Sequence, residues 1–160
     1  MTETITKHEK NLSALIHAST FSKFFIPFGN FIIPLVLWTA NKKEYSFVDY
    51  NGKEAINFQI SLLLYSVLLG IISVPFIIGM LPNIIDFNLF GLSDLSNYNN
   101  LNLHFNLDNF SFSKWMIPLG VTGLTQAALF IVNVVYTIMA TLKTNEGETF
   151  SYPITIKFIK

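Results

Sequence analysis

The chain has 160 residues, of which 51% are apolar and only 12% are charged, about half the charged fraction of a typical soluble domain. Ten basic residues, all lysine, balance ten acidic ones, so the clustered cations that a nucleic-acid binder needs are missing and we expect no nucleic-acid partner. The absence of cysteine excludes disulfide scaffolds, thiol catalysis and cysteine-ligated metal sites.

Three long stretches, residues 24–41, 55–85 and 115–142, contain no charged side chain. A membrane-spanning helix needs about 20 mostly apolar residues, whereas soluble amphipathic helices interleave charges every turn or two. The sequence therefore predicts an all-α integral membrane protein that forms one membrane domain, residues 1–160. We expect three transmembrane helices, at about residues 22–40, 56–81 and 115–142.

The N-terminal tail carries acidic as well as basic residues and is followed by no A-x-A site, so no secretory signal peptide is expected. The first stretch contains Pro27, Gly29, Asn30 and Pro34, which would cost a straight helix backbone hydrogen bonds. It forms either one kinked span or, joined to the preceding residues, two short helices that break near residues 27–30. That broken hairpin would raise the count to four helices.

Lysines near span ends indicate the cytoplasmic side. The connection 41–55 holds Lys42, Lys43 and Lys53, and the C-terminal tail holds Lys143, Lys157 and Lys160. We therefore expect this connection and the C-terminus to be cytoplasmic. The N-terminus lies outside if three helices span the membrane, and inside if the first segment is a hairpin.

An Asn-rich connection, residues 82–114, is predicted to be an extracytoplasmic insertion, since residues 82–113 contain three aspartates and no lysine. Within it, apolar residues alternate with polar ones over residues 101–108, which is typical of a strand or hairpin with one apolar face. The alternative is an unstructured insertion. His104 lies here without partner ligands, so no metal site is predicted.

Polar side chains recur at helical spacing in the second and third spans. Glu54, Asn57, Ser61 and Tyr65 share one face, and so do Thr122, Gln126, Asn133 and Thr137. One interpretation is hydrogen bonding between helices; the other is a polar pathway for an ion, a solute or a peptide.

The run FVDYNGKEAINFQ, residues 47–59, is the most specific motif. Asp49 and Lys53 can pair at i, i+4, Gly52 is expected to mark a helix start or a turn, and Asn57 and Gln59 would enter the headgroups. The motif serves either as a structural turn or as a docking surface, with Asp49, Gly52, Lys53, Glu54, Asn57, Phe58 and Gln59 as the candidate residues.

The chain resembles a family of small uncharacterised bacterial membrane proteins that is distantly related to the twenty-kilodalton subunit of the chloroplast Tic translocon. The residues that carry the resemblance are His17, Pro34, Trp38, Lys42, Lys43, Phe47, Val48, Asp49, Gly52, Lys53, Glu54, Ala55, Asn57, Phe58, Gln59, Gly147, Tyr152 and Pro153. It implies three or four helices, the bacterial inner membrane, and a part in protein import or membrane assembly. The Asn-rich connection departs from the family pattern.

No catalytic motif or cofactor fingerprint is recognisable in the sequence, so we expect neither an enzyme nor a bound cofactor. The leading hypothesis is an accessory or scaffold subunit that contacts membrane lipids and a membrane-protein partner or a second copy of the chain. The alternatives are a small channel or transporter lined by the polar faces, and protection against a membrane-active peptide.

Overall fold

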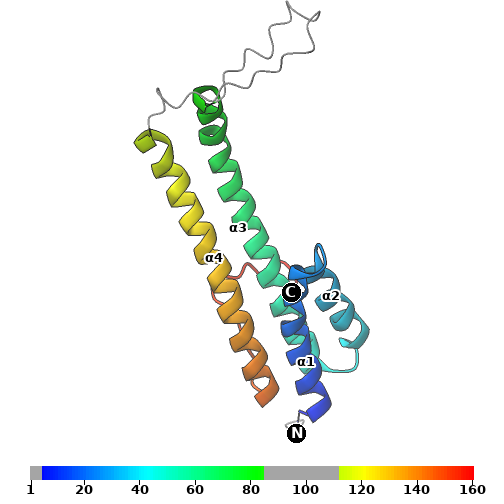
Figure 1. Ribbon diagram of the computed structural model, residues 1–160. Coiled ribbons are helices and arrows are strands. Elements are labelled where there is room, and N and C mark those ends of the chain that lie inside the picture. Colours follow the sequence, from blue (N-terminus) through cyan, green and yellow to red (C-terminus); the bar gives the residue numbers. More distant parts are fainter. Residues whose placement is uncertain (1–4, 85–111) are drawn as a thin grey trace, which may run out of the picture. The chain divides into compact units, whose positions relative to one another are not determined.

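The computed structural model describes residues 5–84 and 112–160 of the chain, and it is helical throughout the regular part of these ranges (Figure 1). The elements are α1 (Lys7–Ser19), η1 (Thr20–Phe24), α2 (Gly29–Asn41), α3 (Ser46–Ile84) and α4 (Phe112–Glu146). The all-α prediction is confirmed. Most of the Asn-rich connection, including His104, lies outside the described residues.

The first charge-free stretch is not one helix. α1 continues directly into η1, which ends at Phe24. α2 begins at Gly29, after a break that contains Pro27 and the left-handed Phe28 (φ 58°). The broken hairpin, rather than a single span at residues 22–40, is therefore the arrangement in the structure, and a count of three transmembrane helices is not confirmed. Proline removes a donor and fixes φ, which explains why the chain turns here.

Two local features stabilise the hairpin, one at the start of α1 and one at the turn. Thr6 and Glu9 form a capping box at the start of α1, with the Glu9 amide donating to Thr6 Oγ1 over 3.2 Å, which satisfies otherwise unpaired amides. At the other end, a methyl group on Gly29 would lie 2.6 Å from Ser22 Oγ and 2.9 Å from its carbonyl. Only glycine lets η1 and α2 approach so closely.

α3 and α4 are long enough and apolar enough to cross a membrane over Ser46–Gly79 and Met116–Glu146. At about 1.5 Å per residue, either stretch exceeds the bilayer core of about 30 Å. The chain divides into two compact units, one made of residues 1–66 and 128–160 and the other of residues 67–127.

The unit of residues 67–127 presents apolar side chains outward. Val67, Leu68, Ile71, Val121 and Leu124 are each at least 49% exposed. In the part of this unit that the structure describes, hydroxyl groups bond within their own helices: Ser73 donates to the Leu69 carbonyl over 2.8 Å and Thr125 to the Val121 carbonyl over 2.8 Å. Such a surface suits a lipid environment, where no water is present to bond polar groups.

The larger unit holds the core. One apolar cluster joins Ile16, Trp38, Val48, Ala55 and Ile56, and a second joins Phe58, Leu62, Ala140, Phe150 and Tyr152. α4 ends in a Schellman motif, where the Gly147 amide (φ 96°) donates to the Thr144 carbonyl and the Glu148 amide to the Lys143 carbonyl. The chain then turns back, so that the residues after α4, 147–160, run along the first half of α3 as the C-terminal tail.

Candidate functional site

The motif FVDYNGKEAINFQ forms the first turns of α3, and its polar residues contact other parts of the same chain. Lys53 Nζ lies 2.6 Å from Asp49 Oδ2 at the expected i, i+4 spacing. The other oxygen of Asp49 accepts a hydrogen bond from Trp38 Nε1 over 2.9 Å. Asp49 therefore holds the end of α2 against the start of α3.

Gly52 lies inside α3, so the expectation that it marks a helix start or a turn is wrong. A methyl group here would lie 2.8 Å from Trp38 Cβ and closer still to Cγ and Cδ1 of the indole. Glycine is therefore required by the close approach of a neighbouring side chain and not by the backbone conformation. The tertiary contact outweighs the low helix propensity of glycine.

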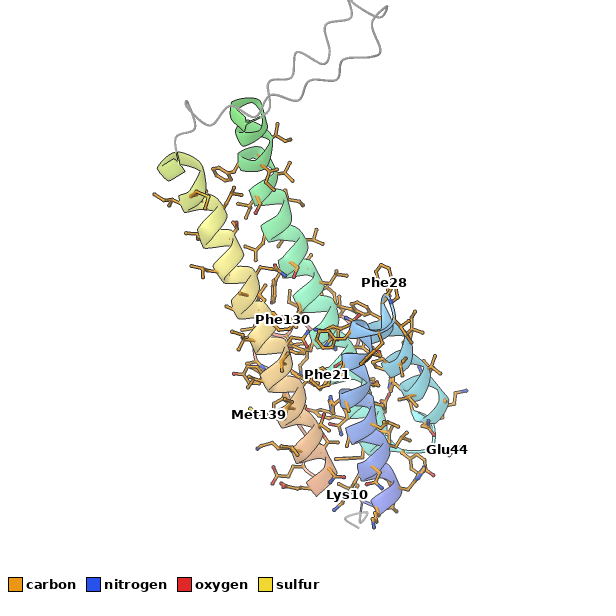
Figure 2. The ribbon with its side chains drawn as sticks, in the orientation of Figure 1. Lys10, Phe21, Phe28, Glu44, Phe130 and Met139 are labelled. Carbon is orange, nitrogen blue, oxygen red and sulfur yellow. The ribbon has the colours of Figure 1, made fainter. Side chains whose placement is uncertain are left out.

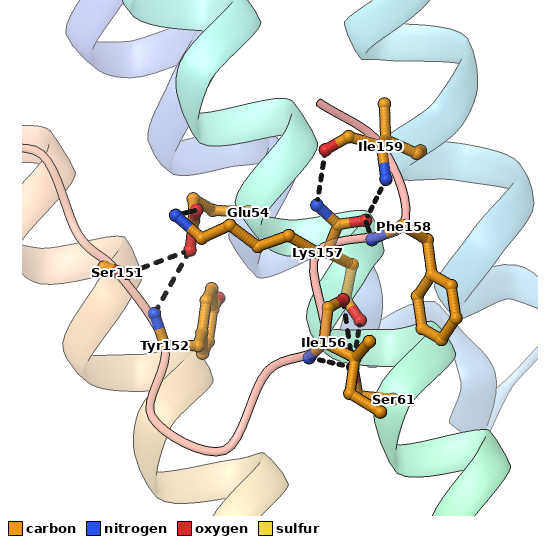
Figure 3. Close-up of polar contacts among 9 residues, drawn as sticks. Glu54, Ser61, Ser151, Tyr152, Ile156, Lys157, Phe158 and Ile159 are labelled. Carbon is orange, nitrogen blue, oxygen red and sulfur yellow. Dashed lines mark hydrogen bonds and ion pairs between the residues drawn. The ribbon is translucent and has the colours of Figure 1, made fainter.

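The polar face of α3 binds the C-terminal tail (Figure 3). Asn57 Oδ1 accepts the Phe158 and Ile159 amides over 3.1 and 2.9 Å, and Asn57 Nδ2 donates to the Ile159 carbonyl over 2.9 Å. The Asn57 side chain thus supplies the backbone hydrogen-bond partners that an extended segment would otherwise find on a neighbouring strand.

Two further residues of this face hold the tail where it reverses. Ser61 Oγ accepts the Ile156 amide over 2.8 Å, and the Tyr65 hydroxyl donates to the Ile154 carbonyl over 2.7 Å. Ile154 has a φ of 56°, a conformation that is rare for a β-branched residue. The tail is therefore fixed on both sides of its turn.

Glu54 is 3% exposed and forms the other anchor of the tail. Its carboxylate accepts the Ser151 hydroxyl over 3.2 Å and the Tyr152 amide over 3.3 Å, and it pairs with Lys157 Nζ at 3.3 Å. Burying a charge is unfavourable unless it is paired and hydrogen-bonded. These three tail groups supply that compensation, so the carboxylate and the tail order each other.

A second polar network centres on His17, which is fully buried between α1, α3 and the tail. Asn51 donates through Nδ2 to the Phe47 carbonyl over 2.9 Å, which turns its Oδ1 toward His17 Nε2, 3.2 Å away. Because Oδ1 can only accept, His17 carries its proton on Nε2, and Nδ1 accepts the Tyr152 hydroxyl over 2.8 Å. Burial lowers the pKa of His17 to about 4, so the imidazole is neutral at pH 7.

The network continues along α4. The Thr144 hydroxyl donates to Asn51 Oδ1 over 3.3 Å. Desolvation raises the pKa of the Tyr152 phenol above its usual range, while a hydrogen bond with Thr137 opposes that rise. Phe58 stacks on the Tyr152 ring with centroids 4.1 Å apart. The tail residue Tyr152 is thereby packed on one ring face and hydrogen-bonded at its tip.

Gln59 links three helices. Its Oε1 accepts the side-chain amides of Asn30 and Asn133 over 3.0 and 3.3 Å, and Thr137 donates to Asn133 Oδ1 over 3.4 Å. The interhelical interpretation thus accounts for Gln59 and Asn133, whereas the bond of Thr137 to Asn133 lies within α4. Gln126 lies at an exposed position of α4, and the hydroxyl of Thr122 bonds the Pro118 carbonyl of its own helix over 3.1 Å.

Sequence reasoning gave no role to Asn51 or Thr144, and it named His17 and Tyr152 only as marks of a resemblance. Asn51 lies between Asp49 and Lys53 in the sequence but on a different side of the helix. The i, i+4 spacing of the charged pair therefore gives no indication of its role. A buried histidine and tyrosine from opposite ends of the chain leave no periodic signal. Among the residues that the structure describes, no group of three or more His, Asp or Glu side chains could hold a metal ion.

The fold and this site define a small helical membrane protein whose C-terminal tail is held by polar side chains of a long helix. Residues 8–159 match the magnetosome magnetite crystal formation protein family (MamF_MmsF), and the chain belongs to this family. No curated protein and no solved structure matches the chain. The comparisons contain no support for the relation to the Tic translocon.

Proposed function

We propose that the protein is a non-enzymatic accessory or scaffold subunit of a membrane assembly. The observation that carries this proposal is that the polar residues of the motif bind other parts of the same chain. Glu54, Asn57 and Gln59 are at most 3% exposed and bind the chain's own tail and helices. A site that must bind and release a substrate or conduct a solute would keep such groups accessible.

The outward part of the same motif is small and amphipathic. Tyr50 is 38% exposed, and it lies between the half-buried Asp49 and Lys53 on the same helix. Tyrosine is enriched at protein–protein contacts and among the residues that dominate their binding energy. We propose that a membrane-protein partner, or a second copy of the chain, contacts this surface.

The family description names magnetite crystal formation in magnetosomes. We propose a corresponding role here, in which the protein organises the membrane in which its partners work; a part in membrane-protein assembly or translocation is the broader form of that proposal. The channel alternative is not favoured, because Asn133 is hydrogen-bonded to Gln59 and Thr137 is hydrogen-bonded to Asn133.

The larger unit also supports a specific topology. Lys10 donates to the Glu146 carbonyl over 3.1 Å, and the His8 ring lies 5.6 Å from that of Tyr45. The start of α1, the connection 42–45 and the end of α4 therefore lie at one end of this unit. With the lysines of all three segments gathered there, we propose that this end is cytoplasmic.

Photocrosslinking tests the scaffold proposal. A photoreactive phenylalanine analogue at Tyr50 should trap one defined protein in the native host, and the same analogue at Val36, an exposed position of α2, serves as the matched control. Tyr50→Ala should reduce co-purification of the trapped protein. Solute flux in protein-containing liposomes that Asn133→Leu abolishes would instead establish a channel and overturn the proposal.

A further inference from the structure

The hairpin of α1, η1 and α2 has an apolar tip that the rest of the described chain leaves largely exposed. Phe25 is 88% exposed, Phe28 69%, Phe24 53% and Ile26 48%. The apolar surface continues along one face of α2 through Ile32, Leu35 and Val36, which are 42–59% exposed. An exposed apolar surface of this extent marks a site that is buried in a larger assembly or in a membrane.

The opposite end of the hairpin is polar. In Figure 2, Phe28 lies at the tip and Glu44 in the connection at the base. At the base, Lys42 Nζ lies 4.4 Å from the Trp38 ring, and Trp38 donates to Asp49. Tryptophan with adjacent lysine is typical of the membrane–water interface, because the ring is apolar on one side and polar at its nitrogen.

Three backbone amides at or beside the tip are hydrogen-bonded within the chain. The Phe25 and Ile26 amides donate to the Ser22 carbonyl over 3.0 and 2.8 Å, the Gly29 amide donates to the Ile26 carbonyl over 3.0 Å, and Pro27 has no amide hydrogen. On α2, the Thr39 hydroxyl donates to the Leu35 carbonyl over 2.7 Å. Irregular backbone can enter hydrocarbon only if its polar groups are bonded within the protein.

Lys23 is the one charged residue next to the tip, and its position is compatible with an apolar environment. Its ammonium lies 5.2 Å from the Phe24 ring centre and 5.6 Å from that of Phe130 on α4. Cation–π contacts replace part of the lost hydration.

We propose that this hairpin is a re-entrant membrane anchor, whose tip, Phe24–Phe28, and the exposed face of α2 contact lipid acyl chains within one leaflet. The 13 residues of α2 extend over about 20 Å, which is too short for the bilayer core of about 30 Å and sufficient for one leaflet. Phe24 packs edge-on against Phe130 with centroids 6.1 Å apart, so the tip adjoins a helix that is itself a candidate span. The inference does not depend on the partner proposed above.

Because the chain contains no cysteine, single spin labels can test the anchor in the full-length protein reconstituted into phosphatidylcholine–phosphatidylglycerol vesicles. Labels at Phe25→Cys and Ile26→Cys should collide with oxygen and be shielded from a water-soluble nickel complex. The control, Glu44→Cys, should show the reverse. We expect the oxygen-to-nickel collision ratio at the tip to exceed the control by about tenfold or more, since polar complexes are excluded from hydrocarbon.

Two results would overturn the proposal. Nickel accessibility at residues 25 and 26 equal to that at residue 44 would place the tip in water. Shielding from both reagents, with dipolar broadening that disappears when labelled protein is diluted with unlabelled protein, would show that a second copy covers the tip. Both labelled side chains are about half exposed or more, so the core remains intact, and unchanged thermal unfolding in detergent verifies this.

Discussion

The contact between Gly52 and Trp38 offers a sharp test of the packing between α2 and α3. In Gly52→Ala, the new methyl group would lie 2.8 Å from Trp38 Cβ. The clash involves the root of the side chain as well as the ring, so rotation of the indole alone cannot relieve it. Either the two helices separate or Trp38 leaves its pocket, where it is 6% exposed, and loses its hydrogen bond to Asp49.

The expected cost follows from two opposing effects. Overpacking a closely packed site destabilises by about 1–3 kcal/mol, and alanine in place of helical glycine stabilises by about 1 kcal/mol. We expect a net loss of up to about 2 kcal/mol, which corresponds to a fall of as much as roughly 8 °C in Tm for a chain of this size. Gly70→Ala is the matched control, because its methyl group would meet nothing within 4 Å, and it should leave Tm unchanged or raise it.

Tryptophan fluorescence in detergent reports the effect directly. The chain has two tryptophans, so the variants are made with Trp115→Phe, and the remaining signal comes from Trp38. Gly52→Ala should shift the emission maximum to longer wavelength as the indole becomes solvated, while Gly70→Ala should not. Equal Tm values and equal emission maxima for the two variants would refute the close approach of Trp38 to α3.

Three further predictions concern the tail, pH and topology. Asn57→Leu removes the partner of the Phe158 and Ile159 amides, so hydrogen exchange at the tail should accelerate and stability should fall by about 1–3 kcal/mol; Ser61→Ala, which frees one amide, should have a smaller effect, and equal exchange in both variants and the wild type would contradict the tail contacts. Burial lowers the pKa of His17 from 6.5 to about 4, so the neutral imidazole contributes stability in full above pH 6.5 that is lost as pH falls toward 4, by about 3 kcal/mol in total; acid unfolding that is identical in His17→Gln would show that His17 does not titrate in this way. Cysteines introduced at His8, Lys43 and Glu148 should react with an impermeant reagent from the same side of the membrane, and labelling of any one from the opposite side would disprove the proposed topology.

The charge distribution by itself determined the helical class and the location of the long apolar helices. Residues 55–85 and 115–142 lack charge, and α3 and α4 cover both stretches, because only helices satisfy their own backbone over such apolar lengths. The prolines and glycine of the first stretch also allowed a broken hairpin, but local signals could not decide between a kink and a break. The left-handed conformation of Phe28 and the close contact of Gly29 with Ser22 arise only where the two arms of the hairpin pack together.

Helical spacing also placed Glu54, Asn57, Ser61 and Tyr65 on one face, and the structure uses that face as a unit. What the spacing could not determine was its partner, which is the C-terminal tail. Periodicity is a property of one segment, whereas the tail reaches this face only after α4 has brought it back. The tertiary structure alone decided that pairing, because an extended segment without a neighbouring strand must find its hydrogen bonds on whatever surface the fold places beside it.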